Sequence, residues 1–507
     1  MKLFEPAEIG KLSIRNRVVM LPMMTRLNEP EGRISQRAID FFEARAKGGT
    51  GLIIAAMWAV NRKVDIAEGG GPHSGVFIAD SDYFLEGLTK LVDAVHKYGA
   101  KIAIQLTAGH GRVAWPYGLA KGAVVPSEQP CFYDPKITAR QLSIEEVSRL
   151  AEGFGVTAKI VSLAGVDAVE IHGHCGYLID QFMTPAWNRR NDRYGRSLEK
   201  RLRFPLDIIE SIQASTGRDF PIIFRMSVTH NYEGGRDVEE SVEIARCLEK
   251  AGVAAINANA SCYDAPTVLQ YPTYDPPGNW VHLAEAVKKA VKIPVITAGK
   301  LGYPELAEGI LQEKKADFIG LARALLADPE WPNKVKESRP DDILMCIGCN
   351  ECMRMIATSH PIGCAVNPLT GREKEIALTK GKKKKRVLVV GGGLVGCELA
   401  VFLSQRGKKV TIIEAGETLL PNEFEFNRTD LLLILNESGV NILTKHQLVE
   451  ITDDGPVISD NSRKRLLKAD TVFLRLHRGY GRFYYPDSDV RPTDFVWGFL
   501  QTDIKRV

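Results

Sequence analysis

The segment from Ser143 to Ile171, SIEEVSRLAEGFGVTAKIVSLAGVDAVEI, holds one complete helix-and-strand unit and sets the fold expected for most of the chain. Ser143 and Glu146 have the spacing of a capping box, which predicts a helix from there to about Ser162. The apolar stretch Ala168–Ile171 then predicts a short buried strand. Alternation of helices and strands is typical of α/β proteins with a parallel sheet.

Seven other short apolar stretches carry the same strand signal. They are Val18–Met20, Leu52–Ala55, Ile102–Gln105, Ile222–Arg225, Ala254–Asn257, Pro294–Thr297 and Asp317–Gly320. Together with Ala168–Ile171 they give eight β/α units, the count of a TIM barrel. We therefore predict an α/β fold that begins with a (β/α)8 barrel over residues 1–335.

Composition narrows the classes of partner. A formal net charge of +4 on 507 residues favours neither nucleic acid nor an acidic membrane surface. The N-terminus carries charge and proline where a signal peptide needs an apolar run, and no apolar stretch is long enough to span a membrane. We expect a cytoplasmic protein that acts on small molecules, with no nucleic-acid or membrane partner.

Four of the nine cysteines gather in one segment. Cys346, Cys349 and Cys352 form a CxxCxxC pattern, and Cys364 returns after a loop. Four thiolates so spaced can enclose an iron–sulfur cluster or a zinc ion, and they suit a reducing compartment better than a disulfide framework does. Bacterial ferredoxins use CxxCxxC, so a [4Fe–4S] cluster is the leading interpretation and zinc the alternative. We assign residues 336–380 to this cluster segment and a linker.

Polar and small residues follow several predicted strands, at the end of a barrel where catalysis takes place. They are Pro22, Met23, Ala56, Gln105, His172, Tyr177, Arg225, Gly299, Lys300, Gly320, Ala322 and Arg323. The backbone amides after the last two strands can approach a phosphate, and Arg323 can pair with its oxygens. The alternative is that the glycines only serve tight turns and that Arg323 lies on a solvated helix face.

These residues, with the run HGHCGYLIDQF from His172 and the segment Asn188–Gly195, resemble the Old Yellow Enzyme barrel. The added cysteines resemble the branch that contains 2,4-dienoyl-CoA reductase, 2-enoate reductase, the bile-acid-inducible NADH:flavin oxidoreductases and trimethylamine dehydrogenase. The resemblance implies a noncovalent FMN. Gln105 and Arg225 would lie near the polar edge of its ring, and Gly299, Lys300 and Arg323 at its phosphate. Pro22, Met23, Ala56, Gly320 and Ala322 complete the implied set.

The resemblance also implies reduction of an activated C=C bond in an enoate, enoyl-CoA or steroid-like substrate. Tyr177 matches the proton donor of the dienoyl-CoA reductases, and His172 is placed to hydrogen-bond the substrate carbonyl. Cys175 departs from the pattern, because relatives carry His, Asn or Glu there. We expect His174 to point away from the site and to be structural.

Two alternative functions stay open. An amine dehydrogenase or demethylase of the same architecture would use aromatic residues such as Trp58 and Tyr263 as a cage for an alkylammonium group. A noncatalytic zinc- and nucleotide-binding or electron-relay protein would use the barrel as a scaffold. His230 and His282 are further candidate acids, each expected to be structural. The loops Pro130–Arg140 and Tyr263–Trp280, which select the substrate, carry no readable code.

A second domain is predicted over residues 381–507, after the charged run Lys382–Arg386. Val387–Val390 predicts a strand, and Val410–Ile413 predicts a second strand that leads to Glu414. The glycines between them have the spacing of a Rossmann dinucleotide fingerprint: Gly391 for the turn, Gly393 for approach of the pyrophosphate and Gly396 for helix packing, with Glu414 placed to accept from a ribose hydroxyl.

Only one such fingerprint occurs, where full-length relatives have one for FAD and one for NAD(P)H. Its Gly393-Leu-Val-Gly396-Cys-Glu wording resembles the nicotinamide module, whereas its position directly after the linker belongs to the FAD module, so both dinucleotides stay open. The closing motif of an FAD module is absent, which makes FAD the weaker alternative. The tail Leu476–Val507 suggests no fold, so we predict an incomplete Rossmann-like domain. Electrons would reach FMN from NAD(P)H directly or from a separate electron-donor protein. A second copy of the chain is the other open partner.

Overall fold

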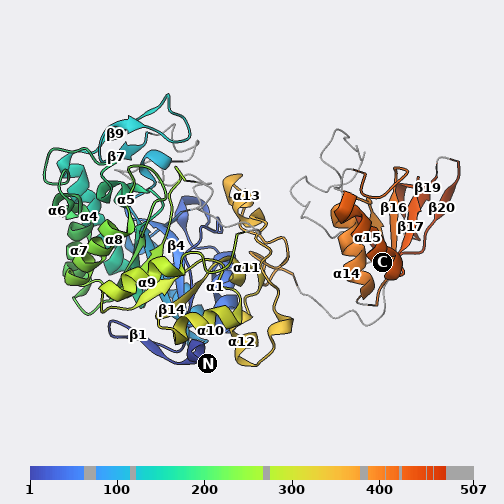
Figure 1. Ribbon diagram of the computed structural model, residues 1–507, viewed down its shortest axis with the longest axis horizontal. Coiled ribbons are helices and arrows are strands. Elements are labelled where there is room, and N and C mark those ends of the chain that lie inside the picture. Colours follow the sequence, from blue (N-terminus) through green and yellow to red (C-terminus); the bar gives the residue numbers. More distant parts are fainter. Residues whose placement is uncertain are drawn as a thin grey trace. The chain divides into compact units, whose positions relative to one another are not determined.

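The computed structural model describes residues 1–61, 76–114, 122–265, 275–376, 386–405, 407–421, 425–452, 454–460 and 462–474. The chain forms two compact units, Met1–Ala377 and Leu378–Val507 (Figure 1). Each unit has its own sheet and its own buried apolar core. The domain limits at residues 335 and 380 stay predictions.

A closed barrel of parallel strands forms the centre of the first unit. Its strands are β3 (Val18–Met20), β4 (Leu52–Ala59), β6 (Lys101–Thr107), β10 (Ala168–Gly173), β11 (Ile222–Ser227), β12 (Ala255–Asn259), β13 (Val295–Thr297) and β14 (Phe318–Leu321). Each strand pairs in parallel with its neighbours, and β3 pairs with both β14 and β4, which closes the ring. The predicted barrel and its eight strands are confirmed.

The long helices of this unit lie around the barrel (Figure 1). They are α1 (Gln36–Lys47), α2 (Leu85–His96), α4 (Ile144–Leu163), α7 (Arg203–Thr216), α8 (Val238–Lys250), α9 (Val281–Ala290) and α10 (Pro304–Gln312). The helix α4 starts where sequence predicts, because the Ser143 side chain accepts from the Glu146 amide and the Glu146 side chain accepts from the Ser143 amide. None of the described helices is long and apolar enough to cross a membrane.

Shorter elements complete the unit. The short helices are α5 (Leu178–Met183), α6 (Leu198–Arg201), α11 (Arg323–Ala327), α12 (Trp331–Lys336) and α13 (Glu351–Ala357). The short strands are β1 (Ala7–Ile9) and β2 (Leu12–Ile14), which pair with each other, β5 (Phe77–Ile78), which adds to β4, and β7 (Val124–Val125), β8 (Gln129–Pro130) and β9 (Thr138–Gln141), which form a separate small sheet.

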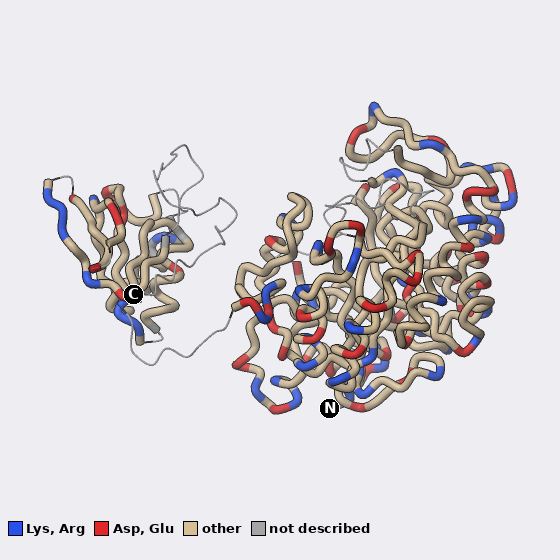
Figure 2. The backbone as a smooth tube through the Cα atoms, turned by 180° about the vertical axis from the view of Figure 1, so that it is seen from behind, with Lys and Arg blue, Asp and Glu red and all other residues tan. Residues whose placement is uncertain are grey.

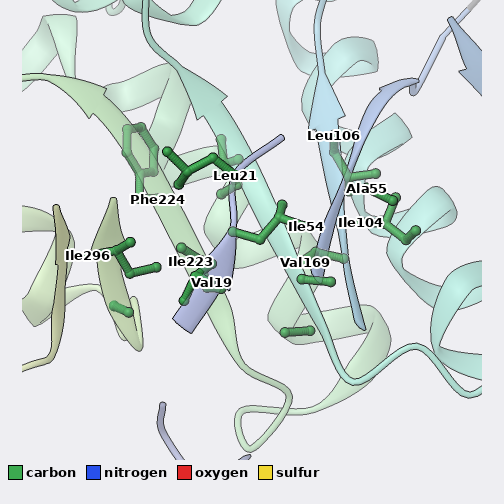
Figure 3. Packing of buried hydrophobic residues seen from close by; sticks show 14 of the residues in the cluster. Val19, Leu21, Ile54, Ala55, Ile104, Leu106, Val169, Ile223, Phe224 and Ile296 are labelled. Carbon is green, nitrogen blue, oxygen red and sulfur yellow. The ribbon is translucent and has the colours of Figure 1, made fainter. Parts of the chain in front are cut away.

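Strand residues supply much of the first unit's core. Figure 3 shows Val19, Ile54, Ile104, Ile223 and Ile296 packed in one cluster, and each of them is fully buried. Burying one such side chain contributes about 1.5–3 kcal/mol to folding, so a core of this size can hold the barrel closed. Positively and negatively charged residues are intermixed along the backbone in both units (Figure 2). This mixture agrees with the small net charge.

The second unit contains a four-stranded parallel sheet in the order β17, β16, β15, β21. Its elements are β15 (Arg386–Val390), α14 (Leu394–Gln405), β16 (Lys409–Glu414), α15 (Glu425–Glu437), β17 (Asn441–Thr444) and β21 (Thr471–Leu474), with an antiparallel sheet of β18 (Gln447–Thr452), β19 (Gly455–Ser459) and β20 (Lys464–Leu466). The β15–α14–β16 unit confirms the predicted Rossmann-like fold. Lys382–Lys385 and the tail Leu476–Val507 lie outside the described residues.

The segment that follows the cysteines is fastened to helix α1 by buried charge. Arg45 is fully buried and forms an ion pair with Glu373, whose side chain is only 8% exposed. Arg45 Nη1 also donates to the Phe41 carbonyl at 2.8 Å, and its Nε donates to the Leu325 carbonyl at 3.1 Å. One guanidinium therefore joins α1, α11 and the chain beyond Cys364.

Replacing Glu373 with Gln leaves the Arg45 charge buried without its counter-charge. We expect Glu373→Gln to lower the free energy of unfolding by about 3–5 kcal/mol. The matched control is Glu375→Gln, since Glu375 pairs with Arg37 at 2.8 Å but is 47% exposed. The control should cost under about 1 kcal/mol. Urea unfolding followed by tryptophan fluorescence measures both, and equal effects of the two variants would contradict this account.

Candidate active site

A cavity of about 290 Å³ lies at the carboxyl ends of the barrel strands. Its lining includes every residue that the sequence assigned to the barrel cofactor and to catalysis: Pro22, Met23, Ala56, Gln105, His172, Tyr177, Arg225, Gly299, Lys300, Gly320, Ala322 and Arg323. Residues from seven different strand ends thus meet in one space. Their individual roles stay predictions.

The register of the barrel strands decides which polar side chains meet. Gln105 stands opposite Glu170 on the neighbouring strand, and Gln105 Nε2 donates to Glu170 Oε2 at 2.6 Å. The other carboxylate oxygen of Glu170 accepts from Asn257 Nδ2 at 2.7 Å. Burial raises the pKa of Glu170 to about 7, although Arg225 opposes the shift. Glu170 therefore fixes the orientation of the Gln105 amide, and Gln105 lines the cavity.

Arg225 and His172 are paired in register on β11 and β10, and both present buried polar atoms to the cavity. Within the described residues, Arg225 Nε and His172 Nδ1 have no hydrogen-bond partner. The two other contacts of the guanidinium, to Pro22 O and Asn259 Oδ1, are long at 3.4 Å. A buried polar group without a partner costs about 1–3 kcal/mol, so a ligand with acceptor atoms would stabilise this wall. The oxygen and nitrogen atoms of a flavin ring meet that need.

The segments after β13 and β14 bring two cations and a turn with positive φ to the cavity wall. Gly299 has φ 117° and Lys300 has φ 54°. Lys300 Nζ donates to the Asp275 carbonyl, and Arg323 Nη1 donates to Asn350 Oδ1. A pair of cations beside an open turn suits the phosphate of FMN. Glycine at position 320 is required for a different reason: a Cβ there would lie 2.7 Å from the Thr297 carbonyl oxygen on β13.

Tyr177 and His172 form a stacked pair on the cavity wall. Their ring centroids are 4.6 Å apart at an interplanar angle of 14°, and His110 packs edge-on to Tyr177 at 4.3 Å. Burial raises the pKa of Tyr177 well above its usual value. Burial and the nearby Arg225 lower the pKa of His172 to about 3. At neutral pH the tyrosine therefore keeps its proton, and the imidazole is neutral.

The prediction for His174 is wrong. His174 lines the same cavity as His172, with their ring centroids 6.0 Å apart. Residues two apart along a strand lie on the same face, and His174 follows directly after β10. Cys175 also lines the cavity, with φ 64° and its Sγ against His174 Nδ1. Cys175, the residue that departs from the family pattern, therefore lies inside the site.

The other candidate residues divide between the site and the core. Tyr263 lines the cavity, and its hydroxyl lies 3.1 Å from that of Tyr177. Trp58 is fully buried, stacks on Phe77 at 4.8 Å and is absent from the cavity wall, so the predicted cage of Trp58 and Tyr263 is wrong. His230 contacts Asp180 at 3.1 Å in the core, and His282 is exposed on α9, so neither lies on the cavity wall.

The four clustered cysteines all line one small cavity of about 20 Å³, together with Arg323 and Leu326. Cys346 and Cys352 also line the larger cavity. Across the described ranges, no group of three or more Cys, His, Asp or Glu side chains is arranged to hold a metal ion. The donor set of four thiols around one cavity nevertheless fits an iron–sulfur cluster. The cluster itself stays a prediction.

In the second unit, the glycine-rich turn adjoins the carboxylate of Glu414. Glu414 accepts from the Gly392 amide at 2.6 Å and from the Gly416 amide at 2.8 Å. A Cβ on Gly396 would lie 2.0 Å from the Gly391 carbonyl oxygen, so only glycine allows this helix start. A Cβ on Gly393 would meet open space, which leaves room for a pyrophosphate.

Some members of the site were not predicted from the sequence. Glu170, Asn257 and Asn259 form the polar row behind Gln105 and Arg225, and each is buried. Polar residues at alternate positions in otherwise apolar strands were the available signal, because successive side chains on a strand face opposite sides. Which of these polar residues meet one another, however, depends on the register between the strands.

Comparison with known proteins gives the same two parts. Residues 2–342 match the family model described as NADH:flavin oxidoreductase / NADH oxidase family, and residues 364–476 match pyridine nucleotide-disulphide oxidoreductase. The chain is 42% identical to an NADH oxidase of Thermoanaerobacter brockii, over 82% of this chain and 64% of the relative. It is 38% identical to a cinnamate reductase of Clostridium sporogenes, over 93% of this chain and 76% of the relative.

A solved structure supports the fold. A 2-naphthoyl-CoA reductase complex has a TM-score of 0.70 at 23% identity, covering 93% of this chain and 92% of that chain. The chain spans 64% of the NADH oxidase and 76% of the cinnamate reductase, so it is shorter than these relatives. The family model covers more than half of the chain, and the twelve candidate residues from Pro22 to Arg323 lie inside the matched range. The chain belongs to the NADH:flavin oxidoreductase / NADH oxidase family.

Proposed function

We propose that this protein reduces an activated C=C bond, in an enoate or enoyl-CoA substrate, with FMN in the barrel cavity and electrons from NAD(P)H. The observation that carries the proposal is the stacked pair of Tyr177, which keeps its proton, and neutral His172 beside the unpartnered Nε of Arg225. A proton donor, a carbonyl-binding group and a flavin-binding wall then share one cavity. The match to a cinnamate reductase along most of the chain supports this reaction class.

Bound FMN would supply hydride transfer to the β carbon of the alkene. The side chains of the cavity would bind FMN and the substrate and would supply the proton. Arg225 and Gln105 would hold the polar ring edge, and Lys300 with Arg323 would hold the phosphate. The His172 imidazole would donate a hydrogen bond to the substrate carbonyl as negative charge develops on its oxygen. The Tyr177 hydroxyl would give its proton to the α carbon.

The wall beside Tyr177 suits a flat, apolar substrate body. Ala56 and Met57 pack with Tyr177 in one buried apolar cluster, and Met24 and Tyr263 pack against it. These residues also line the cavity. An aryl or alkenyl group would bury apolar surface there, which favours binding by about 25 cal/mol per Å². An amine substrate is less well supported, because Trp58 does not lie on this wall.

The cysteine cavity belongs to the same proposal. A [4Fe–4S] cluster held by Cys346, Cys349, Cys352 and Cys364 would lie next to the flavin cavity, because two of these cysteines line both spaces. None of the nine cysteines is joined in a disulfide, which supports the reducing cytoplasmic compartment that we propose. NAD(P)H at the Gly391–Gly396 turn, or a separate donor protein, would supply the electrons. A single glycine fingerprint gives FAD little support.

The cluster assignment predicts a specific loss of iron. Protein purified without oxygen should contain one FMN and about four iron and four sulfide per chain, with little FAD or zinc. Cys349→Ala should lower the iron content severalfold, because it removes one of four ligands, whereas Cys247→Ala on α8 should leave it unchanged. Elemental analysis and flavin release measure both. Zinc in place of iron, without flavin, would overturn the cluster and the reductase together.

The donor assignment predicts a selective kinetic defect. Tyr177→Phe should slow reduction of cinnamate and related 2-enoates by roughly 10²–10⁴-fold, because the ring remains and only the hydroxyl that donates the proton is lost. FMN content and NAD(P)H-dependent reduction of ferricyanide, which takes electrons without a proton from Tyr177, should stay unchanged. The control is Tyr83→Phe, on the surface and 61% exposed. Stopped-flow measurement of each half-reaction tests this, and an unaltered enoate rate would exclude Tyr177 as donor.

A further inference from the structure

Three tyrosines from different parts of the chain form a row that begins at Tyr177. Tyr177 precedes α5, Tyr263 follows β12, and Tyr133 lies between β8 and β9. The Tyr177 and Tyr263 hydroxyls are 3.1 Å apart, with the rings stacked at 5.9 Å and 18°. The Tyr263 and Tyr133 rings meet edge to face with their centroids 6.1 Å apart. Burial raises the pKa of Tyr133, and hydrogen bonding to the Tyr263 side chain opposes that shift. The row therefore runs from Tyr177 through Tyr263 to Tyr133.

Exposure increases along this row. Tyr177 is only 9% exposed, Tyr263 is half-buried and Tyr133 is 41% exposed. The buried end lies on the flavin cavity, and the exposed end meets solvent. A donor at Tyr177 that has lost its proton must regain one in each catalytic cycle, and its own burial hinders direct exchange with water. The row offers a path for that exchange.

The other titratable neighbours of Tyr177 are poor proton sources at neutral pH. Burial and charge lower the pKa of His172 and that of His110 to about 3, so both imidazoles are neutral. Burial raises the pKa of the Cys175 thiol far above its usual range. Tyr263 is the neighbour whose hydroxyl lies within hydrogen-bond distance of the Tyr177 hydroxyl in the described structure. It is therefore the direct source of a replacement proton.

A partly buried ion pair holds the row together. Arg112 forms a bidentate pair with Asp264, the residue after Tyr263, at 2.8 and 2.9 Å, with side chains 12% and 11% exposed. The Arg112 carbonyl also accepts from the amide of Phe132, the residue before Tyr133, at 2.8 Å, and its guanidinium lies 5.7 Å from the Phe132 ring. One arginine therefore fastens both loops that carry the outer tyrosines.

We propose that Tyr263 and Tyr133 form a proton relay that returns a proton from solvent to Tyr177 after each reduction; this inference rests on the proposed function. As a C–H bond forms at the α carbon, the Tyr177 O–H bond breaks. The phenolate oxygen takes the Tyr263 proton, Tyr263 takes the Tyr133 proton, and Tyr133 takes one from water or a buffer acid. No electrons move along the tyrosines, and the net change is one proton from solvent to product.

The kinetic test compares Tyr263→Phe and Tyr133→Phe with the control Tyr83→Phe. Tyr263→Phe should slow enoate reduction about tenfold, with a larger solvent isotope effect and partial rescue by a small buffer acid such as imidazolium. Tyr133→Phe should have a weaker effect in the same direction. In the control Tyr83→Phe, enoate reduction, FMN reduction by NAD(P)H and ferricyanide turnover should all match the wild-type protein. If Tyr263→Phe reduces enoates at the wild-type rate with the wild-type isotope effect, the relay is overturned.

A second readout does not depend on turnover. In protein labelled with ¹³C at the tyrosine ζ carbon, Tyr263→Phe should shift the Tyr177 resonance and its titration, because it removes the hydroxyl partner. Tyr83→Phe should not. No change in the Tyr177 signal would also overturn the relay. Failure of the proposed function looks different: the wild-type protein, with FMN bound and reducible, would then reduce no enoate at all, whatever the variants did.

Discussion

The parallel register of the closed barrel is the constraint on which the site depends. Each strand is fixed against two neighbours, so a polar residue at the carboxyl end of one strand meets a defined residue of the next. Gln105 therefore meets Glu170, and His172 meets Arg225. A slip by one residue would turn these side chains to the opposite face and would bring apolar residues into the cavity. The apolar core that closes the ring thus also assembles the polar wall.

Burying the polar wall of Glu170, Arg225 and His172 costs free energy of folding when no ligand is bound. Glu170 is buried and its pKa is raised to about 7, and Arg225 Nε and His172 Nδ1 lack partners in the described structure. Groups with unmet hydrogen-bonding capacity cluster at functional sites, because a ligand supplies what folding leaves open. The same burial that keeps His172 neutral keeps the proton on Tyr177. The burial that makes this wall costly therefore also sets the protonation states of Tyr177 and His172.

Two arginines outside the flavin wall organise the surrounding chain. Arg45 joins α1 to the segment beyond Cys364 through Glu373, and Arg112 joins the loop after β12 to the loop before β9 through Asp264 and Phe132. Guanidinium groups suit this task, since they donate several hydrogen bonds in fixed directions while burying a long apolar stem. Arg45 stabilises the position of the cysteine segment, and Arg112 stabilises the position of the tyrosine row. Both segments adjoin the same cavity.

The sequence by itself determined the barrel, the Rossmann-like unit and most of the cavity lining. Apolar strand periods, the Ser143 capping box and the glycine spacing are local signals, so they can be read without knowing which segments meet. Only the tertiary structure decided that Glu170 supports Gln105, that His174 shares the cavity with His172, that Trp58 leaves it, and that Tyr133 and Tyr263 extend from Tyr177. Those relations depend on register between strands and on contacts between distant loops, which local sequence patterns do not encode.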